Sequence, residues 1–242
     1  MSLRCYTPAP LVGPAEVELD RETSHHLVRV MRRQVEDAVE LFDGQGNVAQ
    51  GVIQSATKQA ATVAIDKIVS EPQTMPQIIL VQALIRPQPM DFILRKATEL
   101  GVAAIQPVLT QHCVARTRER PERWRKTVVS AAEQCGANWL PELRPVLDWS
   151  EWLQQRAAGG PAVIGALTKD AQLLRDEVRA WSTVPEQVAV CVGPEGDWTA
   201  EEQAAAIESG VVPVSFGRLT LRAETAAVFV MAALRYEFGV AV

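Results

Sequence analysis

Two loops that combine glycine with charged residues are the strongest candidates for chemistry in this chain. Gly193-Pro194-Glu195-Gly196 follows the apolar run 188–192, and the loop 216–222 follows the apolar run 212–216. Glycine has no Cβ, so a ligand can lie close to its backbone, and proline fixes the turn beside it. Such loops suit a small molecule held along the backbone. An ordinary turn between a strand and a helix explains the first loop equally well.

The second loop leads into a charged pair at the start of an apolar helix. Arg222 directly precedes the predicted helix, and Glu224 lies in its first turn. The positive end of the helix dipole stabilises a carboxylate at that position. A fixed guanidinium can stabilise an anion that develops during a reaction. Two structural alternatives stay open: Glu224 as a helix cap, and Arg222 in an ion pair with Glu224 or Glu195.

The elements that must position these loops alternate between strands and helices after residue 73. Apolar runs predict buried strands at 78–81, 105–109, 162–167, 188–192 and 212–216. Helices are predicted at about 90–100, 121–135, 149–157, 171–181, 199–209 and 223–236. This alternation predicts an α/β domain with a mostly parallel sheet. Ligands bind such sheets beyond the carboxyl ends of the strands, so both loops should border one pocket.

The N-terminal region follows a different pattern. Residues 1–69 contain short alternating runs separated by Gly, Asn and Asp, which predicts a small β-rich domain. One helix is predicted at about 23–31, with Thr23 and Ser24 suited to capping its start. Gly44-Gln45-Gly46 matches part of a dinucleotide-binding pattern, but the chain continues as a strand, so a hairpin turn is predicted. Residues 70–76 form the predicted linker, which gives domains of 1–72 and 73–242.

Composition and motif content exclude several classes of protein. The chain has 242 residues, of which 48% are hydrophobic and 22% charged, as in ordinary globular proteins. No apolar run approaches the ~18 residues of a membrane span, and the start of the chain lacks a signal-peptide core. The four cysteines are far apart, which predicts reduced thiols, no metal site and a cytoplasmic location. Neither a P-loop nor a Gly-x-Ser-x-Gly elbow is present.

Basic side chains are clustered although the net charge is −5. The chain has 19 arginines and 5 lysines, and the planar fork of arginine suits phosphates and nucleic-acid bases. Two clusters indicate contact with a polyanion. The candidate nucleic-acid-binding residues in them are His25, Arg29, Arg32, Arg116, Arg123 and Arg125. Solvated helix faces are the alternative explanation.

Six segments of the chain share their order with a known family. They are His25–Arg32, Leu41–Gly44, Lys96–Val102, Ala132–Gln134, Gly193–Gly196 and Leu221–Ala226. Taken together they resemble the RsmE family of ribosomal RNA methyltransferases over nearly the whole chain. The sequence departs from the family pattern at Asp197-Trp198-Thr199, where that family usually has Gly-Phe-Ser. It also departs at Leu219, at His112-Cys113 and at 135–137.

The resemblance implies both a fold and an activity. The implied fold is α/β, with a SPOUT-type trefoil-knotted parallel-sheet catalytic domain preceded by a small PUA-like β-barrel domain. The implied activity is S-adenosylmethionine-dependent methylation of N3 of uridine 1498 in 16S ribosomal RNA. The resemblance also implies that the protein acts as a homodimer and that it meets this RNA within the 30S subunit. A non-catalytic RNA-binding or ribosome-assembly factor that keeps the same fold is the alternative.

The resemblance also implies roles for individual residues. The expected S-adenosylmethionine-binding residues are Leu167, Gly193, Pro194, Glu195, Gly196, Trp198, Leu219, Thr220 and Leu221. Arg222 is expected to stabilise negative charge on the uracil, and Glu224 to orient Arg222 or accept the N3 proton. The final helix is apolar nearly all round between Val228 and Leu234, and is expected at the interface between two copies.

Overall fold

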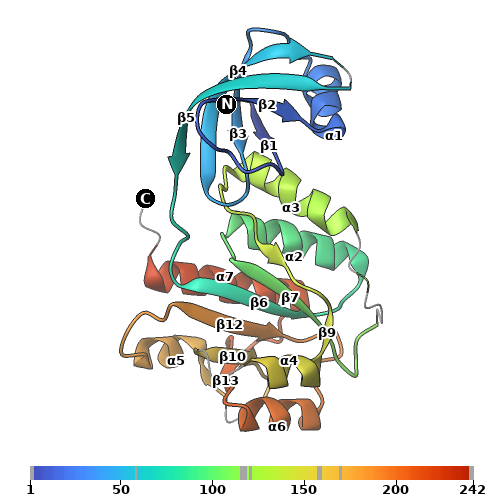
Figure 1. Ribbon diagram of the computed structural model, residues 1–242. Helices are drawn as coiled ribbons and strands as arrows, with labels where there is room; N and C mark the ends of the chain where they lie inside the picture. The colour runs from blue at the N-terminus through green and yellow to red at the C-terminus, as the bar shows by residue number, and fades with distance from the viewer. Residues whose placement is uncertain are drawn as a thin grey trace. The chain divides into compact units, whose positions relative to one another are not determined.

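The computed structural model describes residues 3–57, 59–114, 119, 122–156, 160–168 and 171–239. The chain forms two compact units (Figure 1). The first unit consists of Met1–Gln73 and Val129–Leu140, and the second of Thr74–Val128 and Pro141–Val242. A short later segment of the chain is therefore part of the first unit. The expected boundary at residue 72 does not account for this segment, Val129–Leu140.

The first unit is built on a five-stranded sheet with the order β1-β3-β4-β5-β2. Its strands are β1 (Arg4–Tyr6), β2 (Ala15–Leu19), β3 (Ala38–Phe42), β4 (Asn47–Ala56) and β5 (Ala61–Ser70). β1 and β3 run parallel, whereas the other neighbours pair antiparallel. Buried and less buried residues alternate along β5 from Ala61 to Ile65, as they do in a sheet with one covered face. The β-rich domain expected from the sequence is confirmed.

The turn between β3 and β4 confirms the predicted hairpin. Gly44 and Gly46 have φ of +73° and +88°, in the left-handed region that favours glycine. A Cβ at Gly46 would lie 2.5 Å from the indole of Trp139, which leaves no room for a side chain. The buried Asp43 accepts hydrogen bonds from the N–H groups of Gln45 (2.8 Å) and Asn47 (3.2 Å). The buried carboxylate of Asp43 thus stabilises the turn. Because strand β4 follows the turn instead of a helix, the turn does not form a dinucleotide-binding motif.

Hydrogen bonds explain why residues 129–140 belong to the first unit. The carboxylate of Glu133 accepts the N–H of Tyr6 at 3.2 Å. Arg4 donates to the carbonyl of Ala137 at 2.8 Å and to the side chain of Asn138, and it also pairs with Glu40. Burial raises the pKa of Glu133, against smaller opposing contributions from its hydrogen bond and from His26 and Arg4. The Ala132–Gln134 motif therefore anchors a helix to the edge strand β1.

The helix predicted at 23–31 starts earlier and changes type. It comprises α1 (Arg21–His25) and a π-helical turn, η1 (His26–Val30). Asp20 caps α1, because its carboxylate accepts the N–H of Thr23 at 2.9 Å. The prediction that Thr23 and Ser24 cap the helix was wrong. Ser24 is buried and instead donates to the carbonyl of Leu19 (3.1 Å) and accepts the N–H of Ala61 (2.9 Å).

The second unit contains an eight-stranded sheet with the order β11-β13-β10-β12-β6-β7-β8, in which β9 also pairs with β7. Its strands are β6 (Gln77–Ala83), β7 (Ala104–Leu109), β8 (Glu142–Leu143), β9 (Leu147–Asp148), β10 (Ala162–Gly165), β11 (Gln172–Leu173), β12 (Gln187–Val192) and β13 (Val212–Ser215). Every pairing that the described residues make in this sheet is parallel. The expected α/β architecture is confirmed. The two-residue strands β8, β9 and β11 were missed because they are too short for a recognisable apolar run.

All six predicted helices of this region are present. They are α2 (Pro87–Glu99), α3 (Glu122–Cys135), α4 (Trp149–Gln155), α5 (Leu174–Ala180), α6 (Ala200–Glu208) and α7 (Ala223–Phe238). The first turn predicted for α5 is taken up by β11, so that helix begins three residues late. α7 packs on α2 and on the central strands β6 and β12 (Figure 1), although it follows β13 in the chain. The loop 216–222 must therefore return across the carboxyl ends of β10 and β12.

The described residues lack two features. None of their helices combines the length and the apolar character that crossing a bilayer requires. They also contain no group of three or more His, Cys, Asp or Glu side chains placed to hold a metal ion.

A buried arginine joins α7 to the end of α2. Arg235 is only 8% exposed. Its Nε donates to the carbonyl of Leu100 and its Nη1 to that of Pro76, both at 3.0 Å, while its Nη2 donates to that of Gly101. Leu100 and Gly101 end α2, where carbonyls lack partners within the helix. Burial lowers the pKa of Arg235, and the guanidinium satisfies these carbonyls instead of pairing with a carboxylate.

Replacing Arg235 with methionine should lower the free energy of unfolding by about 1–3 kcal/mol, because buried carbonyls lose their donors. Arg235→Lys should recover little, since one ammonium cannot reach all three carbonyls. Urea denaturation measures both changes. Arg179→Ala is a control from the exposed Arg179–Glu237 pair and should leave the unfolding midpoint nearly unchanged. Equal stability of wild type and Arg235→Met would contradict the structural role.

Candidate functional site

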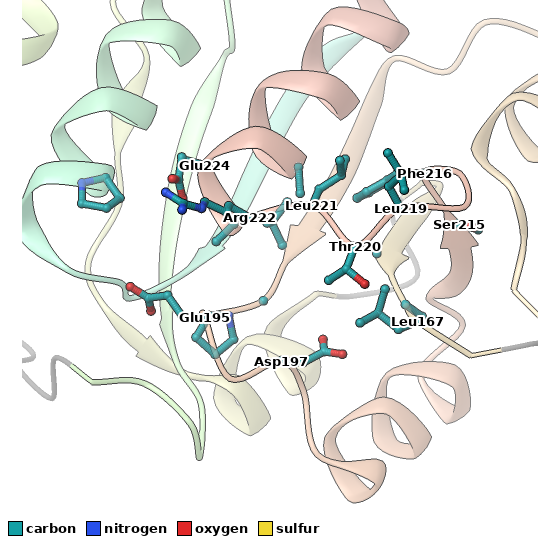
Figure 2. Close-up of a pocket in the computed structure, with 18 of the residues that line it drawn as sticks. Leu167, Glu195, Asp197, Ser215, Phe216, Leu219, Thr220, Leu221, Arg222 and Glu224 are labelled. Atoms are coloured by element: carbon teal, nitrogen blue, oxygen red, sulfur yellow. The ribbon is translucent and has the colours of Figure 1, made fainter.

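A cavity of about 560 Å³ lies beyond the carboxyl ends of β10, β12 and β13 (Figure 2). This is the edge at which open parallel sheets bind ligands. The lining residues come from four segments of the second unit. They are Arg86, Pro89, Gly165–Leu167, Val192–Glu195, Asp197, Ser215–Gly217, Leu219–Glu224 and Ala226. The two loops singled out from the sequence form opposite parts of this lining.

Most of the residues expected to hold a cofactor line the cavity. They are Leu167, Gly193, Pro194, Glu195, Leu219, Thr220 and Leu221, and the expected catalytic residues Arg222 and Glu224 join them. Figure 2 shows Arg222, Glu224 and Glu195 toward one end and Leu167, Leu219 and Phe216 toward the other. The cavity therefore has a charged end and an apolar end. Gly196 and Trp198 are not part of its lining.

Trp198 supports the first loop from behind. Its side chain is 5% exposed, and its ring centroid lies 4.4 Å from that of Trp149, which stacks on Trp152 at 5.0 Å. A Cβ at Gly193 would lie 3.0 Å from Nε1 of Trp198. Gly193 is thus a glycine because the indole fills the space where its side chain would be. The direction in which a side chain would project from Gly193 points at this indole in the protein interior, not into the cavity as the sequence suggested.

The neighbouring loop 110–113 braces the same turn. A Cβ at Gly196 would lie 2.9 Å from Cβ of His112, so this glycine also allows a close approach. Nδ1 of His112 lies 3.0 Å from the carbonyl oxygen of Asp197. The N–H of Gln111 donates to the carboxylate of Glu202 at 2.8 Å. His112, one of the departures from the family pattern, thus packs directly on the candidate binding loop.

Asp197 occupies a position that favours glycine. Its φ is +60°, in the left-handed region. Most side chains are strained there, whereas aspartate tolerates this conformation better than most because its short polar group can bond locally. The family usually has glycine at this point. The departure therefore preserves the backbone shape of the loop while adding a carboxylate to the lining.

The charged end of the cavity is organised around Glu195 and Arg222. Oε1 of Glu195 accepts the N–H of Arg86 at 3.3 Å, which ties the first loop to the start of α2. Arg222 is exposed at the N-cap position of α7, and Glu224 lies half-buried in the first turn. In the described part of the chain Arg222 makes no ion pair, so the expected alternative of a pair with Glu224 or Glu195 is not found. Its guanidinium is available to an incoming anion.

Several lining residues were not predicted. Gly165 and Ala166 end β10, and Phe216 packs its ring against Gly165, where a Cβ would lie 2.7 Å from the ring. Arg86 and Pro89 lie at the start of α2. The signal that could have found them is the one used for the other loops, since they lie at or shortly after the carboxyl ends of the apolar strands β6 and β10. Gly165 was placed inside a strand that in fact ends there.

The candidate RNA-binding residues fall into both units. His25, Arg29 and Arg32 are exposed in the first unit, on α1, on η1 and just after it. Arg123 and Arg125 are exposed on α3 in the second unit, and Nε of Arg123 lies 3.4 Å from a carboxylate oxygen of Asp91. Arg116 lies outside the described residues. Basic side chains thus face solvent in each unit separately.

Two family models match the chain. A model of the RNA methyltransferase domain matches residues 71–235, and a model of the RNA methyltransferase PUA domain matches residues 19–66. The fold and the cavity thus belong to the class of RNA methyltransferases with an N-terminal PUA domain. A relative from Synechocystis sp., ribosomal RNA small subunit methyltransferase E, is 31% identical over 93% of this chain and 75% of its own length. The chain belongs to the ribosomal RNA small subunit methyltransferase E family.

Solved structures agree with this assignment. Ribosomal RNA small subunit methyltransferase E from Neisseria gonorrhoeae, bound to S-adenosyl methionine, is 30% identical and covers 98% of both chains with a TM-score of 0.89. A putative methyltransferase from Legionella pneumophila, in complex with bound cofactor SAM, is 27% identical over 98% of both chains with a TM-score of 0.88. The fold class expected from the resemblance, a SPOUT-type parallel-sheet domain preceded by a PUA domain, is confirmed.

The contact between Gly193 and Trp198 can be tested by adding one methyl group. Gly193→Ala should lower the free energy of unfolding by about 1–3 kcal/mol, because the indole is packed against Trp149 and cannot move away freely. Trp198→Phe in the same chain should recover part of this loss, since the smaller ring leaves room for the methyl group. Chemical denaturation of the two single variants and the double variant measures the coupling. Strictly additive effects would show that the two residues do not compete for space.

Proposed function

We propose that this protein uses S-adenosylmethionine to methylate N3 of a uridine in small-subunit ribosomal RNA. By resemblance to the family, the target is uridine 1498 of 16S ribosomal RNA. The observation that carries the proposal is the cavity of about 560 Å³ at the sheet edge, lined by two glycine-bearing loops and by Arg222, which makes no ion pair with any described residue. A volume of this order suits a nucleoside-sized ligand.

The lining residues fit S-adenosylmethionine. At the apolar end, Leu167, Leu219 and Phe216 would cover the adenine, and the nearby backbone would meet its polar edge. The backbone of residues 193–195 and 219–221 would hold the rest of the molecule. When bound, this cofactor supplies a methyl group carried on a positively charged sulfur. The carboxylates of Glu195 and Asp197 add negative charge to the lining, which suits a cationic group.

Arg222 has the properties that the uracil requires. N3 of uracil carries a proton, and its loss leaves negative charge shared with O2 and O4. A guanidinium that is already in place stabilises such charge without reorganisation. Arg222 is suited to this role, because no carboxylate among the described residues neutralises it. Glu224, in the first turn of α7, accepts the proton or orients Arg222.

The two regions of the chain divide the work. Residues 1–72 contact RNA through His25, Arg29 and Arg32, and residues 73–242 carry the reaction. Arg123, Arg125 and Arg116 add contacts to phosphates, which position an RNA without specifying its sequence. The target within the 30S subunit places the protein in the cytoplasm.

The exposed side of α7 supports a homodimer. Val230, Met231 and Leu234 are buried against the sheet, but Phe229 is 43% exposed and Tyr236 is 86% exposed. The two exposed residues, Phe229 and Tyr236, line an apolar hollow of about 300 Å³ together with Leu173 and Phe216. Phe216 also lines the cavity described above. A second copy packed on this side would therefore lie next to the reaction site.

The function is tested by mapping modified nucleotides in small-subunit ribosomal RNA from a strain without this gene. We expect one N3-methyluridine to be missing and to return when the wild-type gene is restored. An unchanged methylation pattern would contradict the proposal. Binding of S-adenosylmethionine and RNA without any methyl transfer would instead favour the alternative, a non-catalytic ribosome-assembly factor that keeps the fold.

Arg222→Ala should lower the rate of methyl transfer by about 10²–10³-fold, the scale for removing one preorganised donor to a developing anion. Arg222→Lys should recover little, because the planar fork is lost. Single-turnover methylation of RNA measures the rate. Calorimetry with S-adenosylmethionine and sedimentation of the protein serve as controls, and both should give wild-type affinity and the mass of a dimer. Near wild-type transfer by Arg222→Ala would exclude this role, and a monomeric mass for the active protein would exclude the dimer.

A further inference from the structure

Arg86 is a second guanidinium at the cavity, supplied by a different segment of the chain. It lies between β6 and α2, at the N-cap position of that helix, and its side chain is exposed. Its N–H donates to Glu195 at 3.3 Å. This bond involves only the backbone of Arg86. Arg86 is one of the residues that line the cavity, and in the described part of the chain its guanidinium makes neither an ion pair nor a hydrogen bond.

The backbone bond fixes where Arg86 can act. Because Glu195 holds the N–H, the base of the side chain is fixed at the edge of the first loop. Two prolines, Pro87 and Pro89, follow in the first turn of α2 and restrict the backbone further. The backbone of Arg86 is therefore held in place at the edge of the cavity. Its guanidinium can still change rotamer to meet an anion.

A third guanidinium, that of Arg123 on α3, lies beside a carboxylate of α2. Asp91, in the second turn of the helix, holds Nε of Arg123 at 3.4 Å, and the side chain of Arg123 is still 50% exposed. Five residues separate Arg86 from Asp91, which corresponds to about 7–8 Å along the helix axis. Arg86 lines the cavity and Arg123 does not. A ligand that binds both residues must therefore extend out of the cavity, as a nucleic-acid backbone does.

We propose that Arg86 binds a backbone phosphate of the RNA next to the target nucleotide and so places the base against Arg222. The inference rests on the proposed function and adds a substrate-binding residue to the same site. Arg86 and Arg123 then contact the strand outside the reacting base, while Arg222 acts on the base itself. Lysine can replace arginine at such a position, because a phosphate accepts a point charge as well as a fork.

The test compares Arg86→Ala, Arg86→Lys and a matched control, Arg144→Ala. Arg144 belongs to the same unit, pairs with Glu142 at 2.9 Å and does not line the cavity, so its loss removes one positive charge elsewhere. Arg86→Ala should raise the KM for small-subunit ribosomal RNA about tenfold, with a smaller effect on kcat. The slope of log binding constant against log salt should fall by about 0.7–0.9, the contribution of one phosphate contact. Arg86→Lys should restore most of the affinity and the slope.

Affinity for S-adenosylmethionine, measured by calorimetry, should be the same in all three variants and the wild type. If Arg86→Ala loses cofactor affinity and keeps the RNA salt slope, Arg86 holds the cofactor and the inference is overturned. It is also overturned if Arg86→Ala behaves like Arg144→Ala. If the wild type binds RNA but transfers no methyl group, the proposed function fails. The salt slopes of the variants then still decide whether Arg86 contacts phosphate.

Discussion

The position of α7 is the constraint on which the rest of the site depends. The helix follows β13, at one side of the sheet, yet it packs on α2 and on the central strands β6 and β12. The connecting loop must therefore pass across the carboxyl ends of the intervening strands. There it meets the loop that follows β12, and the cavity forms between the two. Arg235 holds the far end of α7 through the carbonyls of Leu100 and Gly101 at the end of α2 and that of Pro76 just before β6.

Close packing behind the loops keeps this cavity open. Trp198 fills the space behind Gly193, and Phe216 fills the space in front of Gly165. In both cases an aromatic ring stands where a side chain on the glycine would be. The backbone is thereby left exposed to the cavity while the rings give the loops a rigid support. Asp197, which directly precedes Trp198, has the left-handed backbone conformation that glycine adopts with less strain.

The charges around the cavity are arranged so that cations are left without partners. Glu195 is engaged by the N–H of Arg86 and Arg123 by Asp91, whereas no described carboxylate pairs with the guanidinium groups of Arg86 or Arg222. Glu195, Asp197 and Glu224 also line the cavity, so its lining carries both signs of charge. In a protein with a net charge of −5, two guanidinium groups there still lack ion-pair partners among the described residues. Net charge alone would have given the opposite expectation for this surface.

The sequence by itself determined the order of the longer strands and of the helices, and it singled out the two glycine loops and Arg222 as candidates, because each has a local signature. Apolar runs define strands, and a glycine or charged residue that follows such a run marks a loop at the sheet edge. This was enough to predict most of the cavity lining. The family resemblance, which also depends on short local motifs, supplied the fold class and the cofactor-binding residues to expect.

Only the tertiary structure decided which side chains face the cavity. Trp198 and Gly196 lie in the correct loop but pack away from the cavity, and Arg86 reaches it from a segment more than a hundred residues away in sequence. The inclusion of residues 129–140 in the first unit likewise depends on bonds made by Arg4 and Glu133 across the sequence. Such outcomes follow from long-range packing, in which the direction of each side chain is set by what fills the space beside it, and local patterns carry no record of that.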